Sequence, residues 1–309
     1  MGANQLPRTA RPTAAVRASA QLMGADAEVT LVGGTIEDAH ACLNVIAALE
    51  AEWSRFRPDS ALSRLSRGET VFIDEATRQL LDWMQRGARA TAGAFDPTLL
   101  REIIDLGYAH SLEDPNRKAP RPPDPKSTAL ITDLTISDPM RLPPGLAIDP
   151  GGIGKGAAAD LTVAFARDRG ASGVLVNIGG DLAAWGEAPE PSAWRVAVEH
   201  PLQQGETLGE VRIAAGGIAT SSQLKRRFQT LGRSESHVLD AHTGRSVAGE
   251  VLTVTVIAGA AWFAEVCTKP GFVWPVRDFL DWLPTVEAAG LLVTREGDTY
   301  ASSNWAGYR

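Results

Sequence analysis

The chain has little cysteine, no long hydrophobic run and no excess of positive charge. Its 309 residues include two cysteines, Cys42 and Cys267, which excludes a disulfide framework and favours two buried thiols over one bridge. No segment approaches the ~20 apolar residues of a membrane-spanning helix. The net charge of −7 argues against a general nucleic-acid binder, because such proteins present a basic face. We therefore expect a globular protein with no membrane span and no nucleic-acid partner.

The sequence also lacks several signatures of targeting and catalysis. Segment 1–22 is rich in Ala, Pro and Thr but has no apolar core of the ~7–15 residues found in secretory signals. We expect a disordered arm over 1–22 and a cytoplasmic location. The five histidines show no zinc-site spacing, and no G-x-S-x-G turn of a serine hydrolase is present. The sequence therefore gives no support to either kind of enzyme.

Apolar periodicity predicts a mixture of helices and strands. Helical spacing is found over 35–56, 74–91 and 157–169, with a further helix starting at 261. Strands are expected at 23–34, 173–178, 194–201, 207–221 and 250–260, with a terminal hairpin at 289–303. Because the two types are mixed without strict alternation, we expect an α+β fold of mixed, largely antiparallel sheets with flanking helices. The Pro-rich segment 111–144 is expected to be a surface loop or insertion.

Glycines crowd the segment between Ala147 and Asp160. They are Gly151, Gly152, Gly154 and Gly156. A glycine-rich segment before a helix is typical of anion sites, because its exposed N–H groups and the helix dipole favour a phosphate. Lys155 would add a positive charge there. The segment matches neither the P-loop nor the G-x-G-x-x-G pattern. A phosphate site and a merely tight turn therefore stay equally open from this segment alone.

Three further segments stand out. A second glycine turn, NIGGD at 177–181, follows one helix and one strand later, so the two turns either border one shared cleft or are tight turns in a core packed with small residues. The segment SHVLDAHTGRS at 236–246 is either a polar surface loop or a contact to phosphate or adenine. The segment ATSS at 219–222 would suit a helix N-cap.

Taken together and in order, eight segments resemble the FAD:protein FMN transferase family, also called the ApbE family. The segments are MGA, WSRFRPDSALSRL, GAFDPTLL, IDPGGIGKGAAADLTVAFARDRGASGVLVNIGGDLAAWG, WRVAVEHP, GIATSS, SHVLDAHTGR and VTVIAGAAWFAEVCTK. The resemblance runs from Met23 to the C-terminal hairpin. It implies an ApbE-like flavin transferase fold with the FAD cleft between two sub-lobes. It also implies a single domain over 23–309, into which the Pro-rich segment is inserted.

The resemblance implies an Mg²⁺-dependent enzyme that splits FAD. Members of the family move FMN from FAD onto a Thr hydroxyl of a target flavoprotein, through a phosphoester bond, and release AMP. The glycine segment is then expected to approach the FAD pyrophosphate and the metal, because a backbone carbonyl reaches Mg²⁺ where no side chain intervenes. The implied partners are FAD and a target flavoprotein with an acceptor Thr.

The resemblance also assigns roles to residues of this chain. Contacts to FAD are implied for Met23, Phe56, Ala94, Phe95, Asp96, Asp149, Lys155 and Val251. His237 is placed at the active site, where it or an aspartate takes the proton of the acceptor Thr, and Lys155 neutralises charge on the phosphates. Asp160 is expected to orient a helix. The metal positions are the Gly152 backbone, Glu265 and Lys269.

Glu265 and Lys269 depart from the family's metal segment, which has Asp and Thr at these positions. The Glu265 carboxylate can ligate Mg²⁺, but a lysine ammonium has no lone pair to offer. Either Thr268 or backbone oxygens complete the metal site, or the Lys269 ammonium occupies the metal position itself. Two alternatives to transfer follow: an FAD pyrophosphatase that releases FMN and AMP, and an FAD-binding protein with little or no transferase activity.

Overall fold

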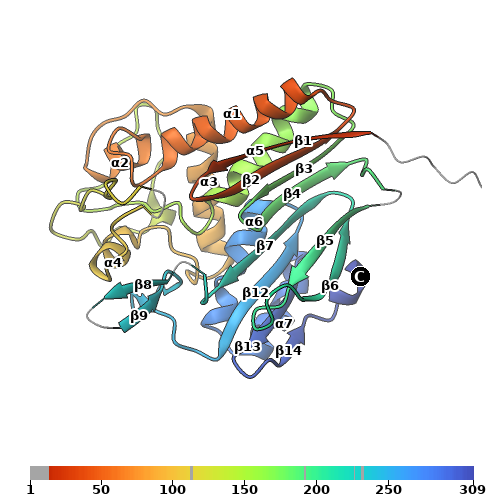
Figure 1. Cartoon of the computed structure of the whole chain (residues 1–309). Coiled ribbons are helices and arrows are strands. Elements are labelled where there is room, and N and C mark those ends of the chain that lie inside the picture. Colours follow the sequence, from red (N-terminus) through yellow and green to blue (C-terminus); the bar gives the residue numbers. More distant parts are fainter. Residues whose placement is uncertain (1–13, 112–113, 191–192, 226, 231–232) are drawn as a thin grey trace, which may run out of the picture.

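The computed structural model describes residues 14–309 apart from 112–113, 191–192, 226 and 231–232. An eight-stranded sheet runs through it in the order β1-β2-β3-β4-β7-β12-β13-β14, and each neighbouring pair is antiparallel (Figure 1). Its strands are β1 (Ala15–Leu22), β2 (Ala25–Val32), β3 (Gly173–Ile178), β4 (Asp181–Gly186), β7 (Gly216–Ser222), β12 (Val251–Ala258), β13 (Ala289–Thr294) and β14 (Thr299–Ala301). Two-stranded ribbons are formed by β5 (Trp194–Glu199) with β6 (Thr207–Ile213), β8 (Arg227–Thr230) with β9 (Arg233–Ser236), and β10 (Leu239–Asp240) with β11 (Arg245–Ser246).

The helices connect and cover this sheet. The α-helices are α1 (Ile36–Trp53), α2 (Ala61–Ser66), α3 (Glu75–Ala90), α4 (Leu100–Asp105), α5 (Gly154–Asp168), α6 (Ala261–Cys267) and α7 (Val276–Trp282). Short 3₁₀ helices are η1 (Ile131–Asp133), η2 (Pro270–Phe272), η3 (Leu283–Val286) and η4 (Trp305–Tyr308). Among the described residues, no helix has the length and apolarity that a bilayer crossing requires.

The two faces of the sheet bury different partners. Along β3, Val174, Val176 and Ile178 belong to a core shared with α1, α3 and α5, whereas Leu175 packs on the other side against the core of the β5–β6 ribbon. This alternation follows from the pleat, which turns successive side chains to opposite faces. The sheet is therefore sandwiched between a helical layer and a small β layer, and its antiparallel strands with segregated helices make an α+β fold (Figure 1).

The sequence predicts the helical boundaries well where a capping residue is present. The helices expected over 35–56 and 74–91 are confirmed as α1 and α3. Thr35 accepts the Asp38 N–H at 3.1 Å, and Asp74 accepts the Thr77 N–H at 2.7 Å, so each helix begins at a side chain that satisfies a free backbone donor. The predicted C-terminal hairpin is likewise confirmed as β13 and β14.

Several expectations about local structure were wrong. The arm predicted over 1–22 includes strand β1, which pairs with β2 along its whole length, while residues 1–13 lie outside the described residues. The strand expected from residue 23 begins at Ala25, because Met23 (φ 56) and Gly24 (φ 70) form the tight turn between β1 and β2. The segment 219–222 ends strand β7 and caps no helix.

The Pro-rich segment over 111–144 is more than a surface loop. Its described residues, all but 112–113, contain one 3₁₀ turn and little other regular structure, yet Ile131, Met140 and Leu142 are buried in the core beside α3. The Gln85 side chain of α3 donates to the carbonyls of Ile131 and Leu134 at 3.0 and 2.7 Å. Since these side chains complete a helical core, the segment is part of the domain's packing.

Candidate active site

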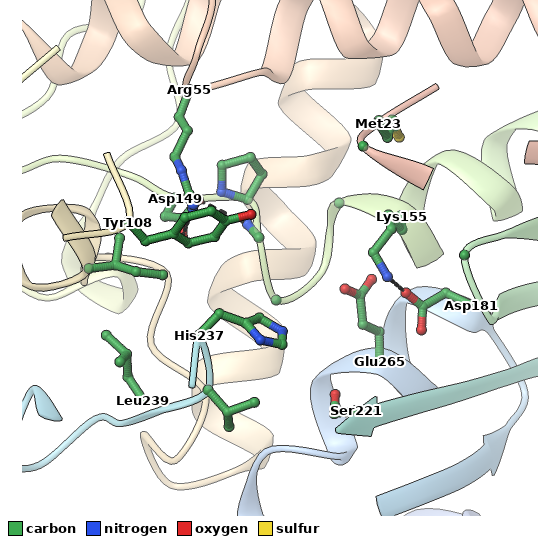
Figure 2. A pocket seen from close by; sticks show the side chains of 18 of the residues that line it. Met23, Arg55, Tyr108, Asp149, Lys155, Asp181, Ser221, His237, Leu239 and Glu265 are labelled. Carbon is green, nitrogen blue, oxygen red and sulfur yellow. Dashed lines mark hydrogen bonds and ion pairs between the residues drawn. The ribbon is translucent and has the colours of Figure 1, made fainter. Parts of the chain in front are cut away.

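A cavity gathers the ends of elements that are far apart in the sequence. It is bordered by the β1–β2 turn, the loop after α1, the glycine segment, the β3–β4 turn, the end of β7, the segment around His237, and α6. The aromatic end of the cavity is formed by Arg55, Phe56, Tyr108 and Asp149. The lysine end is formed by Lys155, Asp181, Ser221, Glu265 and Lys269. Figure 2 shows the His237 imidazole between labelled residues of the two ends.

The aromatic end is built around a buried ion pair. The Arg55 guanidinium lies 2.6 Å from an Asp149 carboxylate oxygen, and the two side chains are 7% and 13% exposed. The guanidinium also lies over the Phe56 ring at 4.7 Å and the Tyr108 ring at 4.6 Å from their centroids. Phe228 stacks on Tyr108 with centroids 5.5 Å apart. Charge and flat apolar surface are thus combined, which suits a heteroaromatic ring system.

Asp149 is held in place by the backbone around it. Its own N–H donates to the Pro97 carbonyl at 2.7 Å, and its carboxylate accepts the Gly151 N–H at 3.1 Å. A Cβ built at Gly151 would lie 3.0 Å from the same carboxylate, so glycine lets the chain turn tightly around Asp149. The entry to the glycine segment is therefore shaped by the ion pair at the aromatic end.

The glycines of the segment serve two different purposes. Gly151, Gly152 and Gly154 border the cavity. Gly156 faces α6 instead, where an added Cβ would lie 2.4 Å from the Ala261 carbonyl oxygen. Helix α5 also begins at Gly154, three residues before the predicted start, so Gly156 lies in its first turn. Close approach to a ligand can explain the first three glycines, but helix packing explains the fourth.

Lys155 is paired with a carboxylate from the β3–β4 turn. Its ammonium contacts the carboxylate of Asp181, which is almost completely buried at the start of β4 (Figure 2). The turn that delivers Asp181 contains Gly179 (φ 61) and Gly180 (φ 95), a left-handed backbone that favours glycine. The two glycine-rich turns do border one cavity, as the sequence suggested, and an ion pair connects them.

Lys269 lies in a ring of oxygens from β7 and α6. Its ammonium donates to Ser221 Oγ at 3.1 Å, to Thr268 Oγ1 at 3.0 Å and to the Glu265 carbonyl at 3.0 Å. The hydroxyl of Thr268 donates to the same Glu265 carbonyl at 2.7 Å, and it lies 2.6 Å from Ser221 Oγ. A Cβ built at Gly152 would be 3.1 Å from Lys269 Cε, so the lysine stem passes directly over the glycine segment.

Two acidic side chains fasten α6 to the first turns of α5. The Glu265 carboxylate accepts the Gly156 N–H at 2.8 Å and so satisfies one of the free donors at the α5 N-terminus. The Asp160 carboxylate accepts the N–H groups of Ala261 and Trp262 at 3.0 and 2.8 Å, which fits its predicted role in orienting a helix. The pKa of Asp160 is raised to about 6. Burial is the largest cause, the two N–H donors oppose it, and the nearby Glu265 charge adds to it.

The predicted site residues converge on the cavity with one exception. Those that line it are Met23, Phe56, Ala94, Phe95, Asp96, Asp149, Gly152, Lys155, His237, Glu265 and Lys269. Val251 is outside this set of lining residues, because it packs at 8% exposure in the core between β12 and α7. Met23 reaches the cavity through the β1–β2 turn, where its N–H donates to Glu50 at 2.9 Å. The chemical roles of these residues stay predictions.

Four of the lining residues to which sequence reasoning assigned no role make contacts that shape the cavity. They are Arg55, Tyr108, Asp181 and Ser221. Three of them lie inside segments that the sequence already singled out, beside Phe56, after the NIGG turn and within ATSS. Tyr108 follows α4 in a stretch without any motif, so only the folded chain brings it over Arg55.

The residues at the predicted metal positions do not fit a magnesium ion. Mg²⁺ requires near-octahedral oxygen ligands at short distance. Here the ammonium of Lys269 already takes the oxygens of Ser221, Thr268 and Glu265, and one Glu265 carboxylate oxygen is engaged by Gly156. Within the described parts of the chain, no three side chains of Asp, Glu, His or Cys come together as ligands.

Comparison with solved structures identifies the fold. The ApbE protein of Thermotoga maritima superimposes with a TM-score of 0.82 at 26% identity, over 96% of this chain and 99% of that one. The apo form of the flavinyl transferase ApbE of Pseudomonas stutzeri gives a TM-score of 0.78 at 24% identity, over 96% of both chains. The fold is therefore that of the ApbE flavin transferases, and the α+β prediction is confirmed.

Sequence comparison identifies the family. Residues 23–291 match the sequence pattern of the ApbE family. The FAD:protein FMN transferase of Salmonella typhimurium is 28% identical over 287 residues, which cover 86% of this chain and 80% of the relative. The FAD:protein FMN transferase of Escherichia coli K12 is 26% identical over 258 residues, which cover 80% of this chain and 74% of the relative. The chain belongs to the ApbE family.

Proposed function

We propose that this chain is an FAD:protein FMN transferase, which moves FMN from FAD to a Thr hydroxyl of a target flavoprotein and releases AMP. The observation that carries the proposal is that one cavity joins the aromatic end, His237 and the lysine end. Such a cavity offers ring surfaces for a heteroaromatic group and two lysines for phosphates. The relatives that carry this activity by name cover most of the chain.

The reaction requires one bond to form and one to break. The acceptor Thr oxygen attacks the phosphorus of the FMN half, and the bond from that phosphorus to the bridging oxygen breaks. AMP leaves with the bond's electron pair on the bridging oxygen, and the Thr proton passes to a base. Negative charge that builds on the phosphoryl oxygens is stabilised by fixed positive groups, for which Lys155 and Lys269 are the candidates.

His237 is the candidate base in this scheme. Figure 2 shows its imidazole between the two ends of the cavity. The proposed function places the FAD pyrophosphate between these ends, within reach of that imidazole. An imidazole is suited to accept a proton near neutral pH. Replacing His237 by Ala should lower the rate of FMN transfer by about 10²–10⁴-fold while FAD binding persists.

Magnesium dependence, which the family resemblance implies, is the part of the activity that the residues of this chain do not support. A lysine stands where the resemblance implies a ligand, and its ammonium takes oxygens that Mg²⁺ would need. In the proposed reaction, Lys155 and Lys269 therefore neutralise the phosphoryl charge, and no metal ion takes part.

The test is covalent flavinylation of a competent acceptor. The purified chain is incubated with FAD and an acceptor domain that the Escherichia coli relative flavinylates, with that relative as positive control. Intact-mass measurement should show the addition of an FMN group to the acceptor and one equivalent of AMP in solution. If the positive control modifies the acceptor and this chain leaves its mass unchanged, with and without Mg²⁺, the proposal is refuted.

The same reaction mixtures separate transfer from the two alternatives. A pyrophosphatase would release free FMN and AMP in the absence of any acceptor, which chromatography of the small molecules detects. A binding protein would leave FAD intact while quenching its fluorescence. Changing the acceptor Thr to Val removes the nucleophile, so a transferase should then give neither flavinylated acceptor nor AMP above background.

A further inference from the structure

Lys269 differs from the other lysine at its end of the cavity in how its charge is held. The ammonium of Lys155 contacts a buried carboxylate, that of Asp181. The hydrogen bonds of the Lys269 ammonium go to two hydroxyls and one carbonyl, which are neutral oxygens. None of these three oxygens carries a formal charge, and together they engage the three N–H donors of the ammonium.

The oxygens around Lys269 resemble the surroundings of a bound cation. They converge from two elements, with Ser221 in β7 and both Thr268 and the Glu265 carbonyl at the end of α6. The hydroxyl of Thr268 is itself oriented by donating to the Glu265 carbonyl, which leaves its lone pairs for the ammonium. Thr268 is completely buried and Glu265 is 2% exposed, so two of the three oxygens come from buried residues, while Ser221 borders the cavity.

We propose that the Lys269 ammonium is a built-in substitute for the divalent cation, so that this chain binds and activates the FAD pyrophosphate without Mg²⁺. The proposal rests on the proposed function for its ligand, because it takes FAD as the molecule in the cavity. It also explains the position of the glycine segment. The Lys269 stem lies against Gly152, so the charge reaches the cavity at the backbone that borders it.

A substitute of this kind has a specific physical consequence. A bound metal adds its affinity for phosphate only at metal concentrations near or above its own dissociation constant, whereas a lysine supplies its charge at every metal concentration. With its three N–H groups engaged by the ring of oxygens, the Lys269 ammonium acts on phosphoryl oxygens through its charge, and it cannot hold them in an octahedral set. FAD affinity should therefore be independent of Mg²⁺ and should depend on the charge of Lys269.

The first experiment uses the unaltered chain. FAD is titrated into the protein in excess EDTA and again in excess Mg²⁺, with flavin fluorescence and calorimetry as readouts. The proposal expects the two dissociation constants to agree within about twofold. A dissociation constant that falls beyond that limit when Mg²⁺ replaces EDTA would overturn it. This result needs no variant, so it decides the matter even if a substitution unfolds the chain.

The second experiment changes the charge at the position. Lys269→Met keeps the length of the side chain but removes the ammonium, and it should weaken FAD binding by about 10- to 100-fold in both EDTA and Mg²⁺. Lys225→Met is the matched control, because Lys225 also borders the cavity but is exposed and paired with Glu199 at 3.0 Å. A folded Lys269→Met protein that binds FAD no worse than Lys225→Met overturns the proposal.

The third experiment tests whether metal dependence can be introduced. In Glu265→Asp/Lys269→Thr, an oxygen replaces the ammonium, so FAD binding should weaken by about tenfold or more in EDTA and recover in Mg²⁺. Failure of Mg²⁺ to restore binding to this folded double variant counts against a cation position at Lys269. The circular dichroism spectrum and thermal midpoint confirm that each variant is folded.

The two proposals fail in different ways. FAD binding that is insensitive to metal, together with no flavinylated acceptor, refutes the transferase and supports the substitution by Lys269. FMN transfer that occurs in Mg²⁺ and stops in EDTA supports the transferase and refutes the substitution. The acceptor assay and the binding titration are therefore performed on the same preparation.

Discussion

The two ends of the cavity hold positive charge in different ways. At the aromatic end, Arg55 is paired with the buried carboxylate of Asp149 and lies over two rings. At the lysine end, Lys269 is held by neutral oxygens. A cation paired with a carboxylate mainly fixes local structure, because its charge is already balanced. Neutral oxygens, unlike a carboxylate, add no opposing charge of their own beside an incoming anion.

Lys155 lies between these two cases. It is close to the glycine segment, but its ammonium contacts the carboxylate of Asp181. To neutralise a phosphate fully, it would have to exchange this partner. The comparison therefore predicts that Arg55 contributes mostly to stability, Lys269 mostly to FAD binding, and Lys155 to binding only as far as Asp181 allows.

The largest effect should come from breaking the ion pair at the aromatic end. Arg55→Met leaves the Asp149 carboxylate buried without its partner, which should lower the free energy of unfolding by about 3–5 kcal/mol. Urea denaturation measures this loss. Arg64→Met, which removes an exposed guanidinium paired with Glu69 at 2.9 Å, is the control and should cost much less. Equal losses of unfolding free energy in the two variants would show that the buried Arg55–Asp149 ion pair stabilises the fold no more than the exposed Arg64–Glu69 pair does.

The next effect concerns the carboxylate that fastens α6 behind the lysine end. The pKa of Asp160 is raised by burial to about 6, so the folded chain holds a proton there that the unfolded chain has already released. The free energy of unfolding should therefore fall as the pH rises from about 4 to about 6, by about 2–3 kcal/mol from this residue, and its contribution should then level off. The substitution Asp160→Asn removes this pH-dependent contribution to the free energy of unfolding. Urea midpoints at several pH values measure it, and identical pH profiles for the two proteins would contradict the expectation.

A smaller effect should separate the glycines between the two ends. Gly156→Ala places a Cβ against the Ala261 carbonyl, which is backbone and cannot easily move, so we expect a loss of about 1–3 kcal/mol in unfolding free energy. Gly152→Ala meets Lys269 Cε at 3.1 Å and the Phe95 ring at 3.2 Å. Because the lysine stem is flexible, this variant should lose FAD affinity more than stability. The two variants are compared by urea denaturation and FAD titration, and a reversed pattern would show that the assignment of the glycines is wrong.

The smallest effect should come from releasing Lys155. Asp181→Asn keeps a hydrogen-bonding group in place but removes the opposing charge, so the ammonium becomes available to a phosphate. FAD should then bind about three- to tenfold more tightly at low salt, with the gain shrinking at high salt. Fluorescence titration at two ionic strengths measures this. Weaker binding of FAD by a folded Asp181→Asn protein would assign Asp181 a direct role toward the ligand.

The fold was predicted most accurately where local chemistry specifies it. The caps Thr35 and Asp74 fixed the starts of α1 and α3, because their side chains satisfy backbone donors within three residues. The strand β1 was missed, because its pattern is weak and pairing with β2 stabilises it. The buried contacts of Ile131 and Met140 were missed because irregular backbone shows no period that a sequence can reveal.

What the sequence by itself determined was the order of motifs, and with it the family, the glycine segment and the positions that depart from the family at Glu265 and Lys269. Only the tertiary structure decided which charges meet. Arg55 and Asp149 are 94 positions apart, and Lys269 and Ser221 are 48 apart. Electrostatic attraction depends on distance in space and on burial, and both are set by packing across the whole chain. The partner of each cation, and hence its remaining charge, was therefore beyond the reach of any local pattern.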